Sequence, residues 1–238
     1  SNLGAAFAAK GELDNAISEY ETALKIDPLL PETRINLGTA MARAGNGEAA
    51  RAHFEEALRA SPSNAAALFN MGLSFYDEQK YAAAGDFFRR AIDAAPAPAI
   101  AHYHLANTLL FTGKPLEAVE HYRSALSLEP GNAQWMNDLA WVLATHEDAK
   151  VRDAREAIRL AEAACASAGD RRPDYLDTLA SAYAEAGRFD EAVQTERSAV
   201  RLLESAGAGD EAKDFRARLE LFILHKPYRA PSERAPAP

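Results

Sequence analysis

The stretch Gly113–Pro130, GKPLEAVEHYRSALSLEP, decides the fold because its pattern returns along the chain. It has a turn glycine, then Ala118, Tyr122 and Ala125 at helical spacing, and it closes on a proline. Equivalent residues recur every 34 residues: Gly11, Ala16, Tyr20, Ala23 and Pro28; Gly45, Ala50, Phe54, Ala57 and Pro62; Ala84, Phe88, Ala91 and Pro96. A fixed period of this length predicts a stacked array in which each repeat packs on its neighbours.

Each period contains two predicted helices. The first carries Leu-Gly or an equivalent pair and an apolar residue three positions later, as in Leu37, Gly38 and Met41. The second carries Ala, an aromatic residue four positions later, and Ala three positions after that. Spacings of three and four place these residues on one helical stripe. Gly or Ala lets the two helices approach closely, and the aromatic ring fills the gap beside them. We therefore predict an all-α array of antiparallel helix pairs.

Six repeats follow from this count, at about 1–30, 31–64, 65–98, 99–132, 133–172 and 173–206. The fifth repeat is irregular, because Thr145–Asp153 lengthens the turn between its helices. Ala161 stands where its aromatic residue is expected, and Glu196 stands there in the sixth repeat. We expect looser or altered packing in the sixth repeat.

Residues 207–225 are predicted to hold a capping helix. Phe215, Leu219 and Phe222 share one of its faces, which would cover the last repeat, and charges occupy the opposite, solvated face. Residues 226–238 form a proline-rich tail that we expect to be extended or disordered. At the other end, Ser1–Gly4 match the middle of a first helix, so we expect the chain to be a fragment with sequence upstream.

The composition excludes several classes of function. The net charge is −9, whereas nucleic acid selects basic surfaces. The charge serves either solubility or an acidic surface for a basic partner. Cys165 is the single cysteine, so no intrachain disulfide is possible. No apolar run has the roughly 18 residues of a membrane span, and we expect no membrane contact by this segment.

These residues resemble the tetratricopeptide repeat (TPR) family, as found in larger bacterial proteins. The family pattern is a large apolar residue, Leu-Gly, an aromatic, a turn Gly, Ala, an aromatic, Ala and Pro over 34 positions. Four consecutive repeats match it, with departures at the early Trp position, which holds Arg34, Leu68, His102 and Met136. The resemblance implies a right-handed superhelical solenoid, with first helices lining a concave groove that binds a peptide or a helix of a partner.

Projection of the period onto that groove gives the candidate binding residues. Asn2, Asn36 and Asn70 share one position, which resembles the asparagine ladder of some family members; the alternative is a polar, solvated residue. A second set projects to the same side as exposed aromatics beside amides: Phe69, Leu73, Tyr76, Tyr103, His104, Asn107, Asn137 and Trp141. The alternative is that some of these rings pack against the neighbouring repeat.

Catalytic and metal-binding patterns are not predicted. His102 and His104 are two apart on a helix and point in different directions, so they suit no metal. Cys165 on an alanine-rich helix fits a buried, inert thiol. No phosphate loop or Ser-His-Asp pattern occurs, and no cofactor is expected.

The leading hypothesis is a non-catalytic scaffold for protein–protein interaction. The alternative is a regulatory or substrate-presenting arm of a larger, membrane-anchored glycosyltransferase-like enzyme. Two features suggest it: the truncated start, and the segment RLELFILHKPYR (residues 218–229), which resembles the C-terminal part of larger bacterial tetratricopeptide proteins. Self-association through the open N-terminal end is a further expectation, since the shortened first helix would leave apolar surface uncovered.

Overall fold

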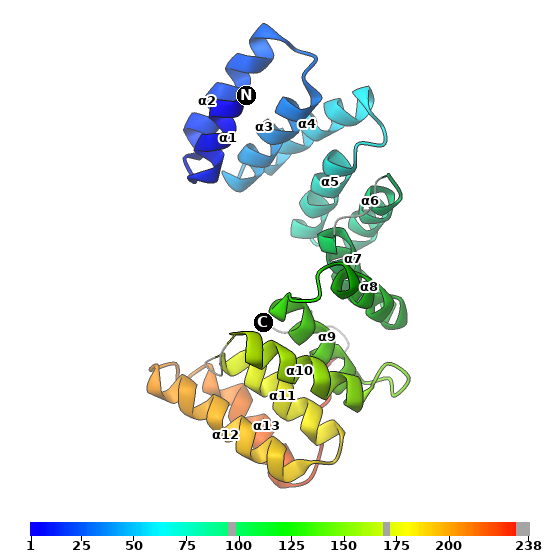
Figure 1. The fold of residues 1–238 in the computed structure, drawn as a ribbon, viewed down its shortest axis with the longest axis vertical. Helices are drawn as coiled ribbons and strands as arrows, with labels where there is room; N and C mark the ends of the chain where they lie inside the picture. The colour runs from blue at the N-terminus through cyan, green and yellow to red at the C-terminus, as the bar shows by residue number, and fades with distance from the viewer. Residues whose placement is uncertain (95–98, 169–171, 232–238) are drawn as a thin grey trace. The chain divides into compact units, whose positions relative to one another are not determined.

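The computed structural model describes residues 1–94, 99–168 and 172–231. These residues form thirteen α-helices and no strand (Figure 1), so the predicted all-α class is confirmed. The helices are α1 (Asn2–Ala9), α2 (Leu13–Ile26), α3 (Pro31–Arg43), α4 (Gly47–Ala60), α5 (Ala65–Asp77), α6 (Tyr81–Ala94), α7 (Ala99–Phe111), α8 (Pro115–Leu128), α9 (Ala133–Thr145), α10 (Ala154–Ala168), α11 (Pro173–Glu185), α12 (Phe189–Ser205) and α13 (Ala212–Ile223). Pro96, which closes the third repeat, lies outside the described residues.

Successive helices pair as the period predicts: α1 packs on α2, α3 on α4, α5 on α6, α9 on α10, and α11 on α12. In every repeat except the fifth, the turn between the two helices depends on a residue in the left-handed region. Gly113 has φ 72°, and the next amide, that of Lys114, donates to the Leu109 carbonyl at 2.8 Å. This geometry satisfies a carbonyl at the end of the first helix. In the third repeat Gln79 adopts φ 59° at the same place, where an L side chain is strained.

The predicted close approach of the paired helices is confirmed. A Cβ atom added to Gly38 would lie 2.6 Å from Cε1 of Phe54, and one added to Gly72 would lie 2.5 Å from Cε1 of Phe88. Both rings are buried. The glycines therefore admit the rings, and each aromatic residue fills the space between the helices of its own repeat.

The chain divides into two compact bodies, Ser1–Thr108 and Leu109–Pro238. The N-terminal body contains α1–α6 and α7 as far as Thr108, and its core is built from the repeated Ala and aromatic positions. The C-terminal body contains α8–α13, the lengthened turn of the fifth repeat and the chain that follows α13.

The lengthened turn is ordered around Arg152. Its Nη1 donates to the carbonyls of His146 and Glu147, at 2.8 and 2.7 Å. Its Nε donates to Oε1 of Glu185 on α11, at 2.8 Å. The nearby Val151 is buried. The inserted residues thus connect the fifth repeat to the sixth.

Helix α13 covers the sixth repeat, as its apolar face predicts. Phe222 is fully buried against Ala180, Ala184 and Ala192. The prediction of a solvated charged face is wrong for Arg218, whose side chain is buried. Beyond α13, residues 226–231 are neither helix nor strand, and 232–238 lie outside the described residues.

Candidate peptide-binding surfaces

A cleft of about 430 Å³ opens between α3, α4 and α5 in the N-terminal body. Thr39 and Arg43 line it from α3, and Asn70 and Leu73 line it from α5. The Asn70 side-chain amide donates to the Ala66 carbonyl at 2.9 Å, so its own helix orients it. Two of the predicted binding residues thus border one open cleft on first helices.

An aromatic cluster surrounds His104 in the same body. The centroid of its ring lies 5.5 Å from that of Phe69, 6.0 Å from Tyr76, 5.6 Å from Phe88 and 5.4 Å from Tyr103. All but Phe88 were predicted as binding residues, and these four are half-buried. The alternative of packing against the next repeat therefore applies to them, because Phe69 and Tyr76 of the third repeat contact His104 of the fourth.

Burial lowers the pKa of His104 to about 4, so its imidazole is neutral near pH 7. Its Nδ1 is buried and has no hydrogen-bond partner among the residues that the structure describes. His104 is thus a polar centre inside a mostly apolar cluster.

The remaining predicted residues differ in exposure. Asn36 is exposed on α3. The expected exposure of Asn107, Asn137 and Trp141 is wrong, since they are 4%, 0% and 9% exposed. The Trp141 ring is covered by Tyr228, with centroids 5.8 Å apart, in the segment that follows α13. Tertiary contacts outside the repeat register therefore close this part of the predicted surface.

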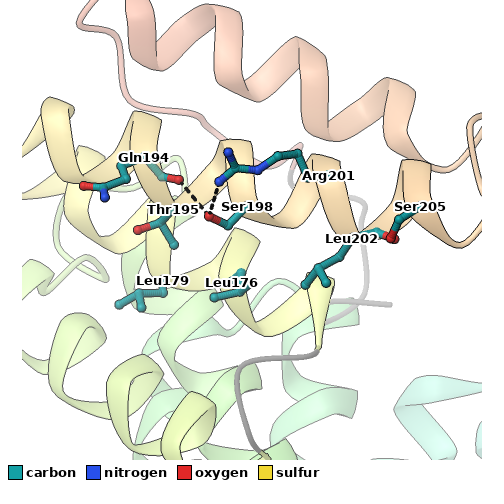
Figure 2. A pocket seen from close by; sticks show the side chains of 8 residues that line it. All are labelled: Leu176, Leu179, Gln194, Thr195, Ser198, Arg201, Leu202 and Ser205. Carbon is teal, nitrogen blue, oxygen red and sulfur yellow. Dashed lines mark hydrogen bonds between the residues drawn. The ribbon is translucent and has the colours of Figure 1, made fainter.

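A second hollow, of about 700 Å³, lies in the C-terminal body and was missed by the sequence analysis. Figure 2 shows Leu176 and Leu179 of α11 below a row of polar residues from α12. In that row, the Ser198 hydroxyl donates to the Gln194 carbonyl at 3.2 Å and accepts from Nη2 of Arg201 at 3.0 Å. The polar residues of α12 recur at spacings of three and four, which places them on one face of the helix. This spacing is the sequence signal that could have indicated the hollow.

Sequence profiles of the tetratricopeptide repeat match residues 35–98, 103–151 and 175–195, and a TPR repeat profile matches 4–45. The chain belongs to the tetratricopeptide repeat family. The predicted fold class, an all-α superhelical solenoid of helix pairs, is confirmed with it. A comparison with curated proteins finds no match.

Solved tetratricopeptide structures share the fold. The Pseudomonas aeruginosa pilF structure is 20% identical with a TM-score of 0.77, and the match covers 91% of this chain and 94% of that one. YrrB, described as a TPR protein with an unusual peptide-binding site, is 19% identical with a TM-score of 0.69, over 82% and 97% of the two chains. An O-GlcNAc transferase mutant from Thermobaculum terrenum is 26% identical with a TM-score of 0.52, over 57% and 26%.

In the sixth tetratricopeptide repeat, a charged cluster replaces the aromatic residue. Glu196, in the aromatic place, is 0% exposed, and its carboxyl group lies beside that of Asp177, with which it shares a side-chain hydrogen bond. Burial and the nearby Asp177 raise the pKa of Glu196 well above its usual value. Arg218 of α13 donates from Nε to Oδ1 of Asp177 at 2.5 Å. The predicted alteration of packing is confirmed, and α13 supplies the compensating cation.

Other site types gain no support from the described residues. Within 1–94, 99–168 and 172–231, no three His, Cys, Asp or Glu side chains gather as a metal site would require. No helix in those ranges combines the length and apolar character needed to span a membrane. Cys165 is buried, as its alanine-rich surroundings predict.

Proposed function

We propose that this tetratricopeptide protein is a non-catalytic scaffold that binds an extended segment of a partner protein along its first helices. The open cleft between α3, α4 and α5 carries the proposal. It offers the amide of Asn70, the apolar side chain of Leu73 and the guanidinium of Arg43. This mixture suits a peptide, because an amide can pair with a ligand's main chain while an apolar group takes a side chain.

The half-buried aromatic cluster extends the proposed surface. Phe69 and Tyr76 lie on α5 with Asn70 and Leu73, and Tyr103 and His104 follow on α7. Partly exposed rings held by neighbouring rings are rigid, so little side-chain entropy is lost when a ligand packs on them. Asn36 adds an exposed amide on α3, whereas Asn107 and Asn137 are buried and do not face a ligand.

The alternative, an arm of a glycosyltransferase-like enzyme, is not favoured. Its support is one solved O-GlcNAc transferase mutant, and the match covers only 26% of that chain. Tetratricopeptide proteins are generally scaffolds and not catalysts.

A selected peptide tests the proposal. Peptides are selected on the immobilised full chain from a random display library, and the affinity of one labelled peptide is measured by fluorescence anisotropy. We expect Leu73→Lys to weaken binding about tenfold or more, because it replaces an apolar contact in the cleft by a solvated ammonium group. Ala82→Lys, the same new side chain on an exposed position of the second helix α6, is the control and should bind like the wild type. Equal affinities of the two helical variants would show that the ligand does not use this cleft.

A further inference from the structure

The chain after α13 turns back and runs along the first helices of the last two repeats. His225, with φ 55°, makes the reversal, and its ring stacks on Phe189 at 4.9 Å between centroids. The Lys226 amide donates to the Leu221 carbonyl at 2.9 Å. In Figure 1 the segment after α13 leads back past α11 toward α9. We call residues 227–230 the return segment.

Three consecutive residues of the return segment hold it in place. The Tyr228 ring packs on Trp141 of α9. Nη2 of Arg229 pairs with Oε2 of Glu185 at 2.6 Å. The Ala230 amide donates to the Thr145 carbonyl at 3.0 Å. One ring, one cation and one main-chain amide thus contact α9 and α11.

An aromatic ring, a cation and a main-chain amide are also the groups through which a protein surface can bind a peptide from another chain. Thr145 is the last residue of α9, so its carbonyl has no partner within the helix and is free for an incoming amide. Glu185 divides its two oxygens between Arg152 and Arg229, and its side chain is only 14% exposed. Without Arg229, a largely buried carboxylate oxygen would lose its cation, which favours another basic group there.

The Arg218 guanidinium completes the place taken by Tyr228. Its Cζ lies 5.4 Å from the Tyr228 ring centroid and 5.8 Å from that of Trp141. A ring that contacts both a tryptophan and a guanidinium gains aromatic and cation–π attraction. The site therefore selects an aromatic residue followed by a basic one.

We propose that Trp141, Thr145 and Glu185 form a docking site for an extended partner segment with an aromatic residue followed by arginine, and that the return segment occupies this site as a built-in competitor. The inference deepens the proposed function and rests on it for the assumption that first helices bind peptides. A partner gains access only by displacing residues 227–230.

The test uses a labelled peptide with the sequence of residues 226–231, KPYRAP, in fluorescence anisotropy. The wild type is compared with the full-length variant Tyr228→Ala/Arg229→Ala, in which the return segment loses its side-chain anchors. A tethered segment competes at an effective concentration on the order of millimolar. We therefore expect the opened variant to bind the free peptide at least about tenfold more tightly than the wild type.

Further variants and a changed peptide establish the chemistry of the site. Added to the opened variant, Glu185→Gln should weaken peptide binding at least about fivefold, because the arginine loses its carboxylate. Glu117→Gln, on the exposed side of α8, should leave it unchanged. A peptide with Ala and Gln in place of Tyr and Arg should not bind. A chain ending at His225 opens the site by a second route, and circular dichroism verifies that both opened proteins are helical.

Two results would overturn the proposal. The first is equal affinity of the wild type and the opened variant for the free peptide. The second is no binding of the peptide by either opened protein. A dimer of the wild type that the opened variant loses would identify the occupant as the return segment of a second copy. The Leu73→Lys experiment is independent, so the cleft in the N-terminal body can fail or succeed separately from this site.

Discussion

Replacement of Arg218 by methionine should destabilise the C-terminal body far more than the loss of an ordinary surface charge. Arg218 is 7% exposed, and it is the cation beside two buried carboxyl groups, those of Asp177 (5% exposed) and Glu196 (0%). Methionine keeps much of the side-chain volume, so the main loss is the charge. Breaking a buried pair by removing one partner costs about 3–5 kcal/mol, and we expect a loss in that range.

Urea unfolding followed by tryptophan fluorescence measures the effect, because both tryptophans of the chain, Trp135 and Trp141, lie in this body. The control is Arg216→Met on the same helix. Arg216 pairs with Glu204 at 2.7 Å, but both side chains are more than 40% exposed, so we expect a loss below about 1 kcal/mol.

The triple variant Asp177→Asn/Glu196→Gln/Arg218→Met gives the decisive comparison. It removes both buried carboxyl groups together with the cation, and it should recover about 2 kcal/mol or more of the loss caused by Arg218→Met alone. If Arg218→Met costs no more than Arg216→Met, or if the triple variant is no more stable than the single one, the cluster is not held together by charge.

Three further predictions concern single residues. The pKa of Glu196 is raised in the folded state, so its contribution to stability is fully present below the unfolded pKa and is lost as pH rises toward the folded pKa. The free energy of unfolding should therefore fall by up to about 1.4 kcal/mol per pH unit above about pH 4.3. Glu196→Gln should remove this slope, which urea unfolding at a series of pH values measures. Gln79→Gly should stabilise the N-terminal body by about 0.5–1 kcal/mol, because glycine adopts φ 59° without strain, whereas Gly113→Ala should destabilise the C-terminal body; thermal melts by circular dichroism that show no opposite shifts would contradict this. Phe88→Ala should cost about 3–5 kcal/mol in urea unfolding, since Phe88 is fully buried against Gly72, and a smaller loss would mean that the helix pair closes the cavity.

The repeats and the packing inside each repeat could be predicted because they depend on residues close in sequence. Gly72 and Phe88 belong to one helix pair, and the period fixes their spacing, so their contact follows from the pattern. The same register brought Asn70 and Leu73 to one cleft. Within the repeats, sequence spacing and spatial proximity are nearly the same information.

The covering of Trp141 could not be predicted in this way. Tyr228 lies in a proline-containing segment whose composition indicates a disordered tail, and no period relates it to α9. Glu196 in an aromatic place did signal altered packing, but the sequence does not relate it to Arg218, which the charge pattern assigned to a solvated face. Both misses concern contacts between a repeat and a segment outside the repeat register.

These departures have a common physical cause. In the aromatic place the fourth repeat holds Tyr122, which is fully buried, whereas the fifth and sixth hold Ala161 and Glu196. An alanine leaves ring-sized volume to be filled by other residues, and a buried carboxyl needs a polar partner. In the sixth repeat that partner is Arg218 of α13, which lies beside Asp177 and Glu196. The proposed docking site and the charged cluster that joins α13 to the sixth repeat therefore share one residue, Arg218.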